Sequence, residues 1–458
     1  YYDIEFQDEP PEALAFGDSK TPLVLPTDQS YSSYVLLPLL NLPLRRRCLL
    51  VGGPGRGKTA IATLMGVLAG YPLRDVKRAI QHGQPQMTIA DLLGNPLPSS
   101  LVAAKSMDEV AVSWRKWLGM KVKIIDEYNR IPTRTQSALL TVMADNYAEI
   151  YDHIYECPEA AWYLTANDDA GGGTYQVIEA LRDRIDVTVA SLHFNTRFLG
   201  ELLLRVEDDF RPEEIAPKEI VFTEKELDRI NERIREVEIP LTVRRRLEFF
   251  AANFEFLEPA AQRLEYMTKD TCKLAGEDPA QLLAGETGRD KLADLGGQSM
   301  NGLSVRALMT LLLFTKAMAF FRGHHEAELE DLRQVMPFVL YDKLVQNQDH
   351  PSLDTDETKA LRTDRISWVR VLFDKACREY DRQNLDTDDP VAEVAAAFEK
   401  GLAGLGEKEV RKRMADITAK LAEWSQGRKL HGPLLDDVLA LKYYHQRYQN
   451  YLRWLLNR

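Results

Sequence analysis

A glycine-rich run that ends in lysine and threonine is the most chemically informative feature of the sequence. It directly follows an apolar run and reads Gly52-Gly53-Pro54-Gly55-Arg56-Gly57-Lys58-Thr59. It fits the pattern G-x-x-x-x-G-K-[ST], in which backbone N–H groups turn inward around phosphate oxygens. The helix expected after it would add the positive end of its dipole. We therefore expect these eight residues to bind a nucleotide, with Lys58 on the β- and γ-phosphates and Thr59 on Mg²⁺.

Two adjacent carboxylates follow a second apolar run. Asp126 and Glu127 come directly after Val122-Lys123-Ile124-Ile125. In open α/β sheets, ligands bind at the C-terminal ends of the strands. We expect Asp126 to hold Mg²⁺ through water and Glu127 to activate the attacking water as a general base. An acidic strand end is common on its own, but beside a phosphate-binding loop it predicts nucleotide hydrolysis.

Further polar residues stand at the end of a third apolar run and after it. Asn167 follows the run 161–165, and its amide could orient the attacking water or touch the γ-phosphate. The alternative is a turn-forming asparagine, because a glycine run at 171–173 comes soon after. Arg182 and Arg184 lie further on, and an arginine can stabilise charge on the γ-phosphate in cis or from a neighbouring subunit. In isolation, two arginines at a helix end would be surface charges.

The elements that must position these residues are strands alternating with helices. Short apolar runs predict buried strands at 48–51, 122–125, 161–165 and 186–189. Strands that alternate with helical patterns indicate a parallel sheet covered on both faces.

The periodicity becomes helical from residue 223 onward. Thr223 and Glu226 form a capping-box pattern that opens a helix, and 304–321 is strongly apolar at helical spacing. A stretch near 257–300 is polar and glycine-rich, as expected of an insertion. Residues 346–365 are polar and predict a linker before further helices.

Composition limits the class of protein. The chain has 458 residues with 28% charged and 45% hydrophobic side chains, which predicts a globular protein of two or three domains. The formal net charge of −12 disfavours binding to nucleic-acid backbones. No run of 18 apolar residues exists, so we expect no membrane insertion. The four cysteines are far apart, which favours free thiols and a cytoplasmic location.

Several segments resemble the MoxR family of AAA+ ATPases. Residues 124–140 read Ile-Ile-Asp-Glu-Tyr-Asn-Arg-Ile-Pro-Thr-Arg-Thr-Gln-Ser-Ala-Leu-Leu, and the last seven match the family's motif letter for letter. Four other segments resemble family blocks: Asp91-Leu92-Leu93-Gly94, Gly173-Thr174-Tyr175 with Glu179-Ala180, Leu303-Ser304-Val305-Arg306-Ala307, and Phe321-Arg322-Gly323. The resemblance covers roughly residues 31–345.

The resemblance implies a fold and a set of site residues. It implies an α/β P-loop AAA+ core with a parallel sheet, followed by an all-α lid, and here also by a C-terminal helical segment. ATP would be held between the subunits of a hexameric ring. Asn167 would be the sensor-1 residue, Arg184 the finger that reaches a neighbour's ATP, and Arg306 the sensor-2 residue of the lid. Arg182 is the alternative finger.

The domain boundaries that we predict are 1–30 for an N-terminal leader, 31–200 for the AAA+ domain, 201–345 for the lid with its insertion, and 346–458 for the linker and C-terminal helical domain. The chain departs from the family at Ile131-Pro132-Thr133, at Val305, and over 101–120, where the usual Gly-Pro block is missing. An extra C-terminal helical part is also found in the RavA branch of the family.

Family members couple ATP hydrolysis to chaperone-like remodelling or assembly of a protein client, usually with a von Willebrand factor A-type partner protein. The resemblance therefore predicts a homo-oligomeric ATPase that uses ATP and Mg²⁺ and acts on protein, and the acidic balance of the chain predicts no nucleic-acid partner. The alternatives from other classes are a nucleic-acid motor or loader, and a slow nucleotide-sensing scaffold. The acidic balance counts against the first, and the intact Glu127 counts against a dead site.

Overall fold

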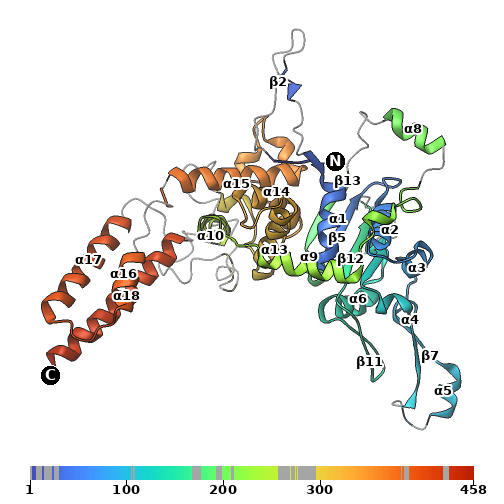
Figure 1. Ribbon diagram of the computed structural model, residues 1–458, viewed down its shortest axis with the longest axis horizontal. Helices are drawn as coiled ribbons and strands as arrows, with labels where there is room; N and C mark the ends of the chain where they lie inside the picture. Colours follow the sequence, from blue (N-terminus) through green and yellow to red (C-terminus); the bar gives the residue numbers. More distant parts are fainter. Residues whose placement is uncertain are drawn as a thin grey trace. The chain divides into compact units, whose positions relative to one another are not determined.

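The protein is described from a computed structural model, whose helices and strands are labelled in Figure 1. The chain divides into two compact units. The first comprises Tyr1–Glu238 and Arg306–Lys343, and the second comprises Ile239–Val305 and Leu344–Arg458. The structure describes residues 3–6, 13–14, 23–24, 30–104, 106, 109–167, 177–191, 199–207, 211–255, 269, 274, 276, 295–382, 384–385, 391–425 and 433–457. The Gly173-Thr174-Tyr175 block and most of the predicted insertion lie outside these residues.

A five-stranded parallel sheet forms the centre of the first unit, which confirms the predicted fold class. Its strand order is β13 (Val187–Ser191), β5 (Arg47–Gly52), β12 (Ala161–Ala166), β9 (Val122–Asp126) and β6 (Gln81–His82). Every neighbouring pair in this sheet is parallel. The four predicted strands are present, and the short edge strand β6 is additional.

Helices cover both faces of the sheet. The side chains of a strand alternate in direction, so the apolar residues of β12 face helices on either side. On one face lies α1 (Ser33–Leu44), and the hydroxyl of Tyr163 donates to its Pro38 carbonyl at 2.8 Å. On the other face, Trp162 and Leu164 join a buried cluster with Leu139 of α6 (Thr133–Asp145). This alternation within β12 explains why its six residues are buried throughout.

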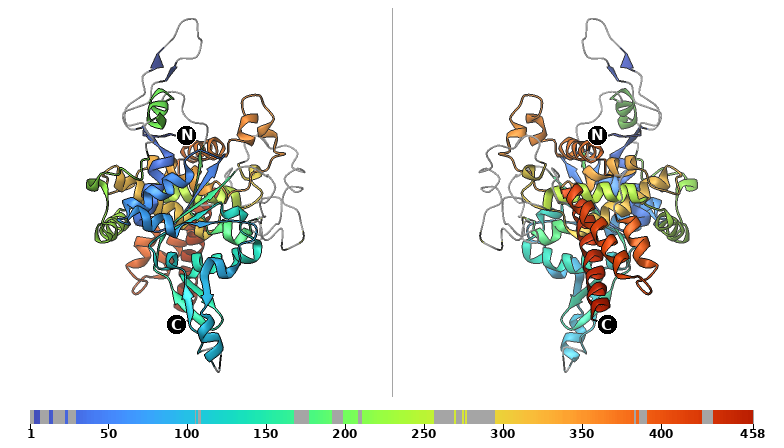
Figure 2. Two further views of the ribbon diagram at one scale, coloured as in Figure 1. Left: turned by 90° about the vertical axis from the view of Figure 1, so that its right-hand side faces the viewer. Right: turned by 90° about the vertical axis from the view of Figure 1, so that its left-hand side faces the viewer.

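Two small projections extend the sheet domain. Antiparallel strands β7 (Gly94–Pro96) and β8 (Val112–Trp114) flank the short helix α5 (Pro98–Ala103), and β10 (Tyr147–Ile150) pairs with β11 (His153–Glu156) as a hairpin. Both project from the same side of the sheet (Figure 2). The rings of Trp114 and Tyr155 lie 5.5 Å apart and connect them.

The other elements of the first unit are shorter strands and connecting helices. Two antiparallel pairs near the N-terminus are formed by β1 (Asp3–Glu5) with β4 (Ser30–Ser32) and by β2 (Ala13–Leu14) with β3 (Leu23–Val24). The helices are α2 (Lys58–Leu68), α3 (Leu73–Ala79), α4 (Ile89–Leu93), α7 (Glu179–Asp183), α8 (Leu199–Glu207), α9 (Glu224–Glu236), α13 (Val305–Phe321) and α14 (Leu329–Leu340). No helix among the described residues is long and apolar enough to span a membrane.

The predicted helix starts in the lid region are present. Thr223 and Glu226 make the full reciprocal capping box, and α9 begins at Glu224. Helix α13 coincides with the apolar stretch predicted at 304–321. Two side-chain hydrogen bonds hold the lid helices to the sheet edge: Thr310 donates to Asp186, and Thr188 donates to Asp342, both at 2.9 Å.

The second unit is helical. Its helices are α10 (Leu241–Glu255), α15 (Arg365–Arg382), α16 (Ala392–Glu399), α17 (Glu407–Ser425) and α18 (Pro433–Leu456). Helices α10 and α15 pack through aromatic pairs, with ring centroids of Phe250 and Phe373 5.5 Å apart. The segment predicted as a linker holds two short 3₁₀ turns, Pro351–Leu353 and Lys359–Arg362, and Leu353 is buried.

We expect the aromatic contact between α10 and α15 to stabilise the second unit. Phe373 and Phe250 are both buried, so Phe373→Ala should lose contacts and leave a cavity. We expect it to lower the free energy of unfolding by about 3–5 kcal/mol, measured by chemical denaturation of the purified protein. Leu439→Ala, at a position that is 47% exposed on α18, is the matched control and should change it by less than about 0.5 kcal/mol. Equal losses for both variants would contradict this packing.

Candidate nucleotide site

The glycine-rich loop connects the C-terminal end of β5 to the first turn of α2. Gly55 and Gly57 have φ values of 73° and 74°, a left-handed conformation that favours glycine. These turns lead directly into α2, which begins at Lys58. The first N–H groups of an α-helix have no acceptor within the helix, so this helix start suits an anion. The predicted strand–loop–helix context of a phosphate-binding loop is therefore present.

The ammonium of Lys58 is buried beneath this loop and fully hydrogen-bonded. It donates to the carbonyls of Gly52 and Gly53 at 2.7 Å each, and to the amide oxygen of Asn167 at 2.9 Å. An ammonium carries three donors, and these bonds use all three. A phosphate oxygen that binds Lys58 must therefore replace one of these acceptors.

The carboxylate of Asp126 lies directly behind the loop. Its Oδ1 accepts hydrogen bonds from the hydroxyls of Thr59 at 2.9 Å and Thr165 at 2.6 Å. A hydroxyl that donates its proton keeps two lone pairs, so Thr59 retains oxygen electrons for a cation. Thr59 and Asp126, predicted as a pair around Mg²⁺, are thus in direct contact.

Glu127 is held at the turn after β9 by two further side chains. Its Oε1 accepts from the Asn167 amide at 2.8 Å, and its Oε2 lies 3.3 Å from the guanidinium of Arg130. Its backbone has a φ of 51°, which is uncommon for a residue with a side chain and typical of active sites and tight turns. The Glu127 N–H donates to the hydroxyl of Thr165 at 2.9 Å.

The structure thus brings together five of the residues that the sequence singled out: Lys58, Thr59, Asp126, Glu127 and Asn167. The two arginines lie elsewhere. Arg184 donates to the Ala180 carbonyl at 3.0 Å, and Arg306 pairs with Asp183. Among the described residues, no hydrogen bond or ion pair links either arginine to the five-residue cluster.

Three members of the site were not predicted from the sequence as functional residues. Thr165 bridges Asp126 and Glu127, Arg130 pairs with Glu127, and His82 Nδ1 lies 3.2 Å from Asp126 Oδ2. Thr165 reads as an ordinary strand residue, and His82 lies in a strand of two residues that has no periodicity. The position of Arg130, three residues after Glu127, was the available signal.

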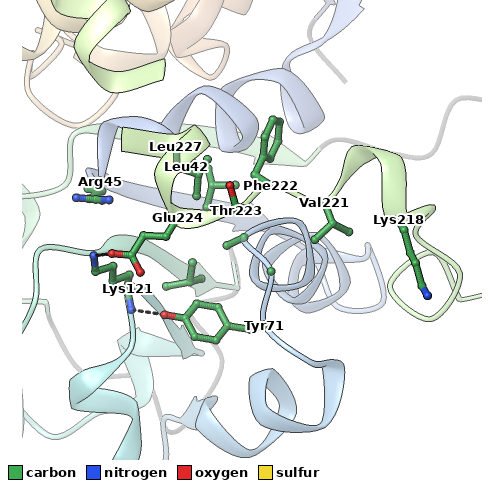
Figure 3. A pocket seen from close by; sticks show the side chains of 13 residues that line it. Leu42, Arg45, Tyr71, Lys121, Lys218, Val221, Phe222, Thr223, Glu224 and Leu227 are labelled. Atoms are coloured by element: carbon green, nitrogen blue, oxygen red, sulfur yellow. Dashed lines mark hydrogen bonds and ion pairs between the residues drawn. The ribbon is translucent and has the colours of Figure 1, made fainter. Parts of the chain in front are cut away.

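A separate hollow of about 510 Å³ lies at the opposite ends of the strands, where β9 begins (Figure 3). Its cationic residues include Arg45, paired with Asp228, and Lys121, paired with Glu224. It is also lined by apolar side chains such as Leu42 and Phe222. Since it lies away from the glycine-rich loop, it is not the nucleotide site.

Two parts of the chain match known protein families. Residues 47–187 match the family described as "ATPase family associated with various cellular activities (AAA)". Residues 299–362 match the family described as "AAA lid domain". This pair of domains is the domain architecture of MoxR-type AAA ATPases, a family of ATP hydrolases.

One solved structure that resembles the chain is that of a candidate ATPase from Cytophaga hutchinsonii. The two are 20% identical with a TM-score of 0.47, and the match covers 73% of this chain and 88% of that one. Similarity at this level supports no conclusion about function. None of the curated proteins matches the chain.

Because the Thr165 hydroxyl bridges Asp126 and Glu127, we expect its removal to slow ATP turnover. Thr165→Val keeps the shape but removes the donor to Asp126 and the acceptor of the Glu127 N–H. A lost hydrogen bond to a charged group costs about 1.5–3 kcal/mol. If this cost falls on the transition state, ATP turnover should drop roughly ten- to hundredfold in a steady-state assay. Thr141→Val, on the outer part of α6, is the control and should leave turnover unchanged. Normal turnover of Thr165→Val would show that the bridge has no role in hydrolysis.

Proposed function

We propose that this AAA ATPase forms a homo-oligomeric ring, with six subunits, and couples ATP hydrolysis to chaperone-like remodelling or assembly of a protein client. The architecture supports this proposal because AAA ATPases usually oligomerise. The proposal includes a von Willebrand factor A-type partner, which rests on the MoxR-type architecture. The observation that carries the motor chemistry is the Asn167 amide, which bonds to Lys58 and Glu127 at once.

The residues around Thr59 and Asp126 fit a bound Mg²⁺. Hydroxyl and carboxylate oxygens are the donors that this cation prefers, usually together with water and substrate phosphates. Bound there, Mg²⁺ would neutralise charge on the phosphates of ATP. In this proposal Thr59 offers a lone pair, Asp126 accepts from the hydration shell, and residues 52–58 hold the phosphates through backbone N–H groups and the Lys58 ammonium.

Hydrolysis then requires a water molecule to attack the γ-phosphorus in line with the bond to ADP. The new bond joins water oxygen to phosphorus, and the bond that breaks leaves its electrons on the β-phosphate oxygen. Glu127 accepts the proton of the water, since its carboxylate has about four lone-pair sites and the described residues engage two of them. Asn167 orients the carboxylate through the hydrogen bond to Oε1.

The arginines complete the proposal. We assign Arg184 as the finger that reaches the ATP of the neighbouring subunit, with Arg182 as the alternative, and Arg306 as the lid residue that senses the nucleotide. Arg184 lies at the end of α7, outside the cluster around Lys58, as a residue that serves another subunit's site should. A positive charge at the γ-phosphate contributes largely to the rate in related reactions.

A nucleic-acid motor is the competing function, and the charge of the chain argues against it. A formal charge of −12 repels phosphate backbones unless a basic surface is concentrated elsewhere. A slow nucleotide-sensing scaffold is the other alternative, and the full set of hydrogen bonds around Glu127 favours active hydrolysis over it.

Two substitutions test the motor. Lys58→Ala should lose ATP binding, because the phosphate charge loses its buried partner. Glu127→Gln keeps the size of the side chain and an acceptor oxygen but cannot take up the proton, so it should bind ATP and lose at least about a hundredfold in turnover. Nucleotide binding and steady-state hydrolysis of the two purified variants and wild type are the measurements.

Glu127→Gln should also retain a protein client when ATP is present, whereas Lys58→Ala serves as the matched control and should not. Equal turnover in wild type and Glu127→Gln would refute the assignment of the base. Stimulation of wild-type hydrolysis by DNA or RNA at physiological salt, without client capture, would favour the nucleic-acid motor.

Mixed rings test the trans role of Arg184. Arg184→Ala should bind ATP but lose turnover, and Lys58→Ala subunits should be inactive alone. Mixing them should restore part of the activity, because some interfaces then combine an intact loop with an intact finger. Hydrolysis across mixing ratios, with mixed assembly verified by tagged subunits, is the measurement. The absence of rescue in verified mixed rings would assign the role to Arg182 or to an arginine acting in cis.

A further inference from the structure

The end of the edge strand β6 is fixed beside Asp126. His82 lies opposite Asp126 in the parallel register of β6 and β9. The next residue, Gly83, donates its N–H to the Asp126 carbonyl at 2.7 Å. A Cβ on Gly83 would lie 2.3 Å from the Glu127 carbonyl oxygen, so only glycine fits this approach. The backbone therefore holds His82 against the acidic end of β9.

The hydrogen bonds of Asp126 are divided between its two oxygens. Both threonine hydroxyls donate to Oδ1, and His82 Nδ1 lies 3.2 Å from Oδ2. Since carboxylate oxygens accept, this bond forms with the histidine tautomer that carries its proton on Nδ1. Among the described residues, His82 is the partner of Oδ2.

The stability of the fold does not require this contact. The His82 side chain is 64% exposed, and contacts of this kind at the surface contribute little to folding. Asp126, the partner of His82, is largely buried: its side chain is 17% exposed and lies in the proposed cation site. The effect of His82 is therefore to be sought in the orientation of that carboxylate.

We propose that His82 is a positioning residue of the ATP–Mg²⁺ site. It fixes the second oxygen of Asp126, so the plane of the carboxylate is set by bonds on both sides, and the carboxylate faces the Thr59 hydroxyl. The inference rests on the proposed roles of Thr59 and Asp126 and adds a residue from outside both motifs. The role needs only the Nδ1–H donor and no positive charge.

Three substitutions of His82 test whether the position of its N–H donor matters. His82→Asn keeps an N–H donor at the same number of bonds from the Cα atom as Nδ1. His82→Gln moves the donor one bond further out, and His82→Ala removes it. His325→Ala is the matched control, because His325 is an exposed histidine of the same compact unit, outside the site.

Two measurements read out the cation directly. The first is the affinity for a fluorescent, non-hydrolysable ATP analogue, in excess chelator and in saturating Mg²⁺. The second is the Mg²⁺ concentration that gives half-maximal ATP turnover. Loss of an orienting partner of a metal ligand typically costs about 10–100-fold in metal affinity or activity. We expect His82→Ala to need about tenfold more Mg²⁺ and to bind the analogue normally in chelator. His82→Asn and His325→Ala should match wild type, and His82→Gln should resemble His82→Ala.

Three results would overturn the proposal: an unchanged Mg²⁺ requirement in His82→Ala, equal behaviour of His82→Asn and His82→Gln, or an equal loss of analogue affinity with and without Mg²⁺. The Asn and Gln variants decide the question even if the alanine variant does not fold. Failure of the proposed function looks different, since wild type itself would then show no Mg²⁺-dependent binding of the analogue.

Discussion

The parallel pairing of β5, β12 and β9 is the constraint on which the nucleotide site depends. Residues Thr165 and Ala166 of β12 lie opposite Leu50 and Val51 of β5, and Leu164 lies opposite Ile125 of β9. All three strands therefore end at one edge. The hydrogen bonds between the side chains that meet there are 2.6–2.9 Å long. A slip of one residue moves a strand by about 3.3 Å and would break them.

The Asn167 amide has a special place at this edge because it joins a cation to an anion. Its oxygen accepts from Lys58, and its NH₂ group donates to Glu127. A planar amide cannot turn one end without turning the other. If a phosphate oxygen replaced the Asn167 oxygen as an acceptor of Lys58, the amide could rotate. That rotation would also move the NH₂ group that donates to Glu127. The geometry thus offers a short path from the proposed phosphate contact of Lys58 to the orientation of Glu127, the proposed base.

The sequence predicted those features that depend on residues close together in the chain. The loop at 52–59, the four longer strands and the capping box at Thr223 each follow from neighbouring residues, and the structure contains them all. Thr165 and His82 could not be found in this way, because their roles depend on a partner some 40 residues away. Thr165 is a β-branched residue in a buried strand, where threonine is common whether or not its hydroxyl has a task.

Arg184 and Arg306 illustrate a different difficulty. A motif names the residue, but the charges around it come from elsewhere in the fold. Here the C-terminal end of α7 carries Asp183, which pairs with Arg306 through its carboxylate and accepts from Lys343 through its carbonyl at 2.7 Å.

Burial lowers the pKa of Lys343, so its ammonium needs such partners. Asp186, three residues after Asp183, accepts hydrogen bonds from Thr310 of α13 and from the N–H and guanidinium of Arg47. The lid helices thus reach the sheet through the turn that carries Arg184. Residues 306–343 share a compact unit with the sheet, and these bonds lie within it. A shift of α13 would therefore act on this segment through Thr310 and Asp186, without passing through the glycine-rich loop.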